Sequence, residues 1–145
     1  MNNNIYQCLE CGVSITKGIH QFSRDIHGVP LCIQHQLWIA GSGATDEAII
    51  LYFALKSNKV PVILGYSDSR KKIDIALPGK LYIEVDDKNH YGSEQPLTEF
   101  PGTYYSWKEK IPTIRIPISV IHDPYKLRII VDRLAEMCRD YKQTG

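Results

Sequence analysis

The chain has 145 residues, of which 43% are hydrophobic and 23% are charged, and its formal net charge is +1. This length allows one ordinary core, or one core plus a small metal-stabilised module. The near-zero charge excludes a histone-like nucleic-acid binder, so any DNA binding must come from a local patch and bound cations. No apolar run approaches the roughly 20 residues of a membrane span, and the polar start lacks the regions of a signal peptide. We therefore expect a soluble, cytoplasmic protein with no membrane contact.

Three of the four cysteines lie in the first 32 residues. Cys8 and Cys11 are separated by two residues, as are Cys32 and His35, and twenty residues lie between the pairs. Two intervening residues let both side chains of a pair turn toward one ion, and three thiolates with a neutral imidazole complete a tetrahedral zinc site. Because four protein ligands leave no position for water, the sequence predicts a structural zinc rather than a catalytic one. His27 remains an alternative to His35, although the paired spacing favours His35.

The layout of residues 6–38 resembles a treble-clef or LIM-like zinc finger. Short extended segments are expected there, and residues 27–31 suggest the turn and strand of a hairpin that delivers Cys32 and His35 at the start of a short helix. We assign residues 1–40 to this finger domain. The fourth cysteine, Cys138, is expected to be a core thiol.

The remainder, residues 45–145, is expected to form a second domain after a small-residue joint at 40–44. Thr45 as an N-cap, followed by Asp46 and Glu47 in the first turn, predicts a helix over 45–58. The other expected elements are strands at 60–65, 72–77, 81–86 and 113–121, a helical turn near 104–110, and a helix at 125–142. This order predicts a three-layer α/β core with a mixed central sheet flanked by helices.

Two carboxylates fall on the predicted hairpin. A three-residue loop at 78–80 sets a register that places Asp74 directly opposite Glu84. Strict alternation puts Ile73 and Ile75 on the other, apolar face. Two close carboxylates repel unless a divalent cation lies between them. Oxygen ligands suit Mg²⁺ or Mn²⁺, and such an ion can activate water for phosphodiester hydrolysis.

The order of a helix with Glu47, a strand, Asp74 and then Glu84-Val85-Asp86 resembles the PD-(D/E)XK nuclease superfamily. With His90 further on, residues 45–140 are similar to the branch that includes very-short-patch-repair endonucleases. The resemblance implies a restriction-endonuclease-like core. It also implies that Asp74 and Glu84 bind the catalytic Mg²⁺ or Mn²⁺, that Glu47 reaches the site from its helix, and that His90 lies near the scissile phosphate.

The chain departs from the family signature at one position, because Asp86 stands where a lysine is expected two residues after the glutamate. Lys72 and Lys88 are candidates for supplying the missing positive charge. Strand parity places Lys88 and His90 on the face of Glu84 and Asp86.

These features predict a metal-dependent endonuclease that hydrolyses double-stranded DNA, with restriction, repair or mobile-element defence as the context that the analogy implies. Two alternatives remain open. The first is a non-catalytic zinc-finger module that binds DNA or protein on a degenerate nuclease fold. The second is an RNA-directed or structure-specific nuclease. A homo-oligomer or a protein partner is compatible with either alternative.

Overall fold

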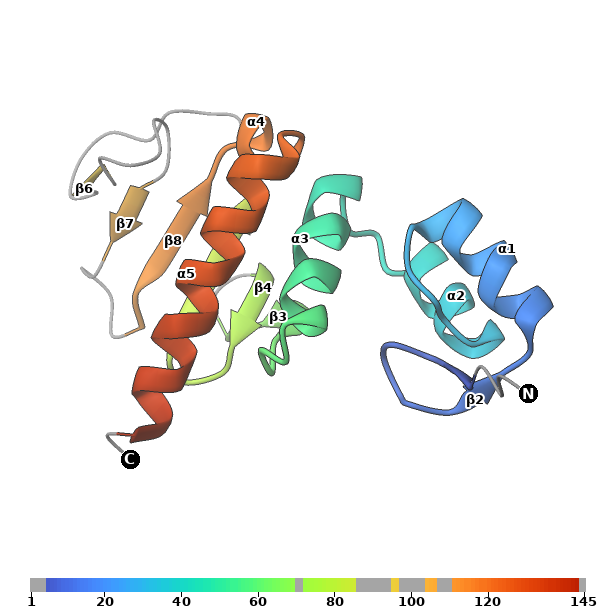
Figure 1. Ribbon diagram of the computed structural model, residues 1–145. Helices are drawn as coiled ribbons and strands as arrows, with labels where there is room; N and C mark the ends of the chain where they lie inside the picture. The colour runs from blue at the N-terminus through green and yellow to red at the C-terminus, as the bar shows by residue number, and fades with distance from the viewer. Residues whose placement is uncertain (1–4, 70–71, 86–94, 97–103, 107–110, 144–145) are drawn as a thin grey trace. The chain divides into compact units, whose positions relative to one another are not determined.

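The computed structural model describes residues 5–69, 72–85, 95–96, 104–106 and 111–143 (Figure 1). The chain divides into two compact units, Met1–Gly43 and Ala44–Gly145. The division falls within the stretch of small residues that follows the cysteines and His35. Among the described residues, no helix has the length and apolar character needed to cross a membrane.

The first unit contains two short strands and two helices. The strands β1 (Tyr6–Gln7) and β2 (Ser14–Ile15) pair antiparallel, and they are followed by α1 (Lys17–His27) and α2 (Ile33–Ala40). The helix α1 was not expected, because the residue types that suggested metal binding obscured its signals. Those signals are a threonine N-cap, whose hydroxyl accepts from the N–H of Ile19 at 3.2 Å, and a C-terminal glycine with φ of 78°.

The expected hairpin over residues 27–31 is wrong, because this segment caps α1 and links it to α2. Gly28 takes the left-handed conformation that ends the helix, and its N–H donates to the Arg24 carbonyl at 2.9 Å. The buried Ser23 hydroxyl donates to the Val29 carbonyl at 2.7 Å and accepts from the Leu31 N–H at 2.8 Å. These side-chain bonds satisfy backbone groups that a strand partner would otherwise satisfy.

The second unit begins with α3 (Asp46–Ser57), as predicted. Thr45 caps it by accepting from the Ala48 N–H at 3.2 Å, and Asp46 and Glu47 occupy the first turn. The buried residues of α3 are Ala48, Leu51, Tyr52, Phe53 and Leu55.

A six-stranded mixed sheet follows, with strand order β3-β4-β5-β8-β7-β6. Its strands are β3 (Ile63–Ser67), β4 (Lys72–Leu77), β5 (Leu81–Val85), β6 (Gln95–Pro96), β7 (Tyr104–Ser106) and β8 (Thr113–Ile116). The β5–β8 pair is parallel and the other pairs are antiparallel. The mixed α/β architecture and the β4–β5 hairpin are therefore confirmed.

Three expected elements of the second unit differ from the structure. The strand expected over 60–65 begins only at Ile63 and runs to Ser67. The helical turn expected near 104–110 is wrong where the structure describes it, because β7 pairs there with β8. The strand expected over 113–121 ends at Ile116, since Pro117 N-caps the short helix α4 (Ile118–Ile121). The last helix, α5 (Pro124–Gln143), agrees with its prediction.

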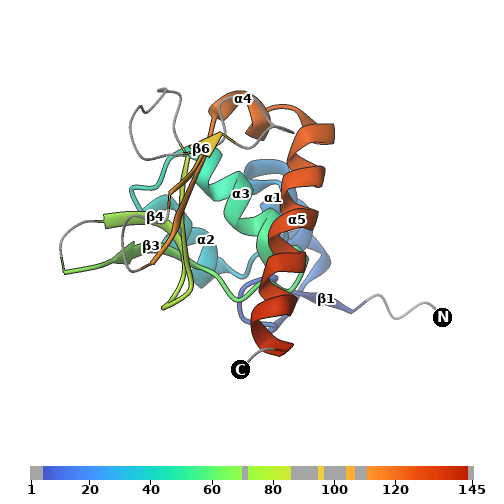
Figure 2. The same cartoon turned by 90° about the vertical axis from the view of Figure 1, so that its left-hand side faces the viewer.

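The helices of the second unit form one layer over the sheet within the described residues. Because α3, α4 and α5 contact one another, they share one side of the sheet (Figure 2). The expected three layers are thus corrected to two for the described part of the chain. The reason lies in the connection from β5 to β8, whose described parts are the strands β6 and β7 rather than a crossover helix. Buried residues of the sheet include Ile75, Ile83, Ile114 and Ile116.

Candidate metal centres

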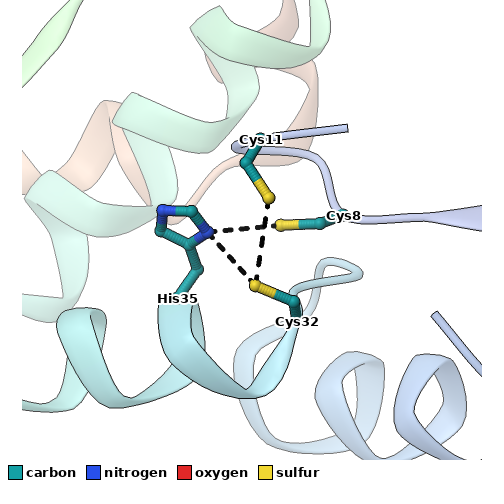
Figure 3. A group of neighbouring side chains, drawn as sticks. All are labelled: Cys8, Cys11, Cys32 and His35. Carbon is teal, nitrogen blue, oxygen red and sulfur yellow. Dashed lines mark hydrogen bonds between the residues drawn. The ribbon is translucent and has the colours of Figure 1, made fainter. Parts of the chain in front are cut away.

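Three thiols and one imidazole converge in the first unit. Figure 3 shows the side chains of Cys8, Cys11, Cys32 and His35 directed toward a common point. Their ligand atoms all lie within 4.8 Å of one another. The Nδ1 atom of His35 lies 3.6 Å from the Cys8 sulfur and 3.3 Å from the Cys32 sulfur, and the sulfurs of Cys11 and Cys32 are 4.0 Å apart.

These distances fit a tetrahedral zinc. With zinc–sulfur bonds of about 2.3 Å and zinc–nitrogen bonds of about 2.0 Å, tetrahedral ligands stand about 3.8 Å apart for two sulfurs and about 3.5 Å apart for sulfur and nitrogen. Among the described residues, the cluster of at least three side chains that could hold a metal ion is this group. Its histidine is His35, and His27 is not a member. The group can therefore hold a metal such as zinc.

The backbone between β1 and β2 forms the knuckle that presents the first ligand pair. The N–H of Gly12 donates to the Cys8 carbonyl at 2.8 Å, and the N–H of Cys8 donates to the Val13 carbonyl at 2.9 Å. Gly12 has φ of 75°, a conformation that favours glycine. The tight turn thus brings Cys8 and Cys11 to the same side.

The second ligand pair comes from the start of α2. Cys32 is the N-cap residue of α2 and His35 lies in its first turn. The ring of Trp38 meets the His35 imidazole edge-on, with centroids 5.7 Å apart and an interplanar angle of 86°. The helix and this aromatic contact together set the direction of the imidazole.

The thiols are held in unequal surroundings. Burial raises the pKa of Cys8, but N–H groups of Cys32, Cys11 and Glu10 outweigh it and bring that pKa to about 7. The Val13 N–H lowers the pKa of Cys11, but desolvation and the neighbouring thiols of Cys8 and Cys32 raise it overall. Crowded thiolates repel one another, and a divalent cation removes that repulsion.

The second candidate centre is the carboxylate pair on β4 and β5. The register pairs Ile75 with Ile83 and Leu77 with Leu81, as the three-residue loop predicted. Gly79 in the loop has φ of 75°. Asp74 precedes Ile75 on β4, so the same register brings it beside the last residues of β5.

The Asp74 carboxylate is anchored to the end of β5. Its Oδ2 atom accepts a hydrogen bond from the Val85 N–H at 2.9 Å. The side chain of Glu84 is close enough for a hydrogen bond and a charge interaction with Asp74. The structure therefore brings together the two carboxylates that the sequence predicted as metal ligands.

Strict alternation along β4 breaks at Asp74. Ile73 packs with Ala76 and Tyr82, which are paired across β4 and β5 and share a face. Ile73 therefore does not lie on the face that alternation predicted. Across from Asp74 on β3 stands Gly65 with φ of 67°, and the paired residues of the two strands skip this position.

The electrostatics of the pair make Glu84 unusual. Burial raises its pKa first, the negative charge of Asp74 and a hydrogen bond with it raise it further, and the result is about 7. Arg115, the neighbour of Glu84 in the parallel β5–β8 register, acts in the opposite direction. Near neutral pH the pair therefore holds a proton that a divalent cation could replace.

We expect the Glu84 carboxyl, followed by carbon NMR without added divalent cation, to titrate with a midpoint near 7. Asp74→Asn should lower this midpoint, because it removes a negative charge that favours the protonated form. Asp25→Asn, at an exposed position of α1 in the first unit, is the matched control and should leave the midpoint unchanged. Titration of Glu84 near its ordinary 4.5 would contradict the arrangement.

In its described part, the structure does not show the other predicted site residues beside the carboxylate pair. Glu47 contacts His122, whose Nε2 lies 3.0 Å from the Glu47 Oε1, so its described contact is at the end of α4. The Glu47 N–H and the His122 side chain lower the pKa of Glu47. The predicted residues Asp86, Lys88 and His90 lie outside the described residues.

Three polar contacts were missed by sequence reasoning. The hydroxyl of the buried Tyr82 donates to the Asp68 Oδ2 atom at 3.0 Å, and Ser69 donates to the other carboxylate oxygen at 3.2 Å. A buried tyrosine needs a partner for its hydroxyl, which was the available signal, but its partner could not be named from spacing. The His122 contact with Glu47 had no local signal, because the two residues are 75 positions apart.

Comparisons with family models, curated proteins and solved structures found no match to this chain. The protein is therefore described by its own fold and candidate centres. A small unit with a Cys₃His group that can hold a metal such as zinc precedes a mixed α/β unit that carries a carboxylate pair.

Proposed function

We propose that this protein is a metal-dependent endonuclease that hydrolyses DNA phosphodiester bonds, with Asp74 and Glu84 holding Mg²⁺ or Mn²⁺. The observation that carries the proposal is the meeting of these two carboxylates on neighbouring strands, with the pKa of Glu84 raised to about 7. A pair of this kind is costly to keep without a ligand, because like charges in a partly buried place repel. Perturbed carboxyl groups cluster at functional sites for this reason.

The donor set fits a hard divalent cation, since carboxylate oxygens suit Mg²⁺ and Mn²⁺. When bound, such an ion supplies Lewis acidity and an activated water for phosphodiester hydrolysis. The Val85 N–H fixes one oxygen of Asp74 at 2.9 Å, which orients the carboxylate. Arg115 lies beside Glu84 in the register and offers a positive charge to a phosphate oxygen.

Double-stranded DNA is the proposed substrate because its negatively charged phosphodiester backbone is attracted both by the bound cation and by the neighbouring basic residues. Lys72 lies on β4 with Asp74, and Arg115 lies on β8, the strand that pairs with β5. The net charge of +1 means that this attraction is local. The Cys₃His group is proposed to bind a structural zinc, and its thiols suit a reducing, cytoplasmic compartment.

A second candidate function is a non-catalytic module that binds DNA or protein on a degenerate nuclease fold. Asp86 in place of the signature lysine favours it. So does the first unit, whose helices carry large exposed apolar side chains, among them Phe22 at 59% and Leu37 at 69%. Such surfaces often mark contacts with other molecules.

Incubation of supercoiled plasmid with the purified protein separates these functions. We expect nicking or linearisation with Mn²⁺ or Mg²⁺ and none with Ca²⁺, whose larger and more flexible coordination sphere suits the chemistry poorly. Single-stranded DNA and RNA of the same sequence, run alongside, test the choice of substrate. Binding of plasmid without cleavage under every cation would favour the second candidate.

A further inference from the structure

The two helices of the first unit form an open apolar groove. A groove of about 380 Å³ is lined by Gly18, Ile19 and Phe22 from α1 and by Ile33, Gln36 and Leu37 from α2. None of the six residues is ionisable, and the polar one, Gln36, donates its side-chain amide to the Leu31 carbonyl at 3.0 Å. The lining therefore selects an apolar occupant.

Large apolar side chains around this groove face water. Phe22, Ile26, Ile33 and Leu37 are between 58% and 69% exposed. With a full surface of about 200 Å² for a large apolar residue, the four leave roughly 500 Å² of apolar surface uncovered, at the upper end for a patch on a monomer. This surface sits on a unit of 43 residues, and an apolar patch of this size often marks an interaction site.

The helix α1 itself has the pattern of a groove-binding helix. Ile19, Phe22 and Ile26 recur at intervals of three and four residues, which is the spacing of anchors on a helix that lies in an apolar groove. The groove and the helix that fits it are therefore parts of the same unit. This is the arrangement that a two-fold symmetric interface requires, because each copy offers the same patch to the other.

Area and charge agree with such a pairing. Two copies that cover this patch on each other bury about 1,000 Å² from the four side chains alone, close to the lower limit of roughly 1,200 Å² for specific interfaces before the rim is added. The net charge of +1 produces little repulsion between copies. An interface of this size lies at the low end of the range for specific protein–protein contacts.

The geometry points to the α1–α2 groove as a homodimer interface, in which α1 of a second copy of this chain lies in the groove. The inference is independent of the proposed nuclease activity, because it rests on the first unit alone. It gives a role in dimerisation to Phe22 and Leu37, which take part in neither the proposed zinc binding nor the proposed phosphodiester cleavage.

Sedimentation velocity of the zinc-loaded full chain tests the interface without any activity assay. Over a range from about 1 to about 300 μM, chosen to span a weak interface, we expect the mass to rise from 16.5 kDa toward twice that value. Phe22→Glu and Leu37→Glu should each remain at 16.5 kDa at every concentration, because each variant places an unpaired carboxylate in the apolar contact, where loss of its hydration is costly. Zinc content is measured for each variant, so that loss of the finger fold is not mistaken for loss of the contact.

Tyr125→Glu is the matched control, since Tyr125 is 74% exposed on α5 in the second unit. This variant should associate as the wild type does. In methyl NMR, resonances of Ile26, Ile33 and Leu37 should shift with concentration, while those of Ile63, 44% exposed on β3, should not. A wild-type mass that stays monomeric, a zinc-loaded Phe22→Glu that still dimerises, or a Tyr125→Glu that does not would each overturn the proposal.

Discussion

Replacing Cys8 or Cys32 with serine is expected to release the metal from the first unit and to unfold both of its helices. The unit has few buried residues with which to fold by itself: within its described part they are Cys8, Ser23, Leu31 and Ile39. Zinc ligation contributes about 10–16 kcal/mol of apparent folding free energy in small finger peptides. A unit whose core is this small cannot compensate for such a loss.

Metal analysis and circular dichroism measure this effect. The wild type should carry one zinc per chain, and the Cys8→Ser and Cys32→Ser variants should lose it together with the helical signal of α1 and α2. Cys138→Ser is the matched control, because Cys138 is a buried thiol of α5 in the second unit and should not affect zinc content. A folded, zinc-free wild type would show that the converging thiols serve another purpose.

The members of the Cys₃His group could be predicted because the geometry within each pair is local. Two residues between Cys8 and Cys11, or between Cys32 and His35, place both side chains on one side of a knuckle or helical turn. The helix between the two pairs was missed although its N-cap and its terminal glycine are visible in the sequence. The metal-type residues at either end of this segment favoured short extended segments over a helix.

The register of the β4–β5 hairpin was also predictable, because a three-residue loop fixes which residues face each other. The positions of Ile73 and Glu47 were not. Ile73 leaves the expected face at an irregularity opposite Gly65, a residue of another strand with positive φ. Glu47 contacts His122 because α3 and α4 pack together in the folded unit. Both depend on contacts between distant segments, which periodicity does not report.

The parallel β5–β8 pairing is a further consequence of tertiary structure. Apolar β-branched residues at 113–116 indicated a strand, but no local feature named its partner. The pairing places Arg115 beside Glu84, which gives the carboxylate pair its cationic neighbour. Part of the candidate site is thus built by topology rather than by a motif.

The carboxylate pair supplies the most demanding test of the proposed nuclease. Asp74→Asn and Glu84→Gln keep the shape of each side chain and remove its charge, so each should weaken cation binding. We expect single-turnover cleavage of plasmid at saturating enzyme to fall by at least about 10²–10³-fold in each variant, the usual effect of losing one electrostatic contributor to a transition state. Asp74→Asn retains an oxygen that can accept from the Val85 N–H, so a loss of activity cannot be ascribed to that hydrogen bond.

Glu84→Gln should increase the thermal stability of the cation-free protein even though it decreases cleavage. Above pH 7 both carboxylates are ionised and repel, so replacing one by a neutral amide should raise the melting temperature of the cation-free protein at pH 8. At pH 5 the effect should shrink, because Glu84, with its pKa of about 7, is already protonated there. The direction follows from linkage: a carboxyl whose pKa is raised by folding contributes stability below its unfolded pKa and loses it as pH rises through 7.

Glu136→Ala is the matched control for the cleavage measurement. It removes one negative charge from an exposed position on α5, so it changes the net charge as the two test variants do, and it should cut at the wild-type rate. Both test variants must retain zinc and a cooperative thermal transition for the comparison to hold. Wild-type cleavage rates in Asp74→Asn and Glu84→Gln would then mean that the pair does not hold the catalytic ion, whatever its pKa.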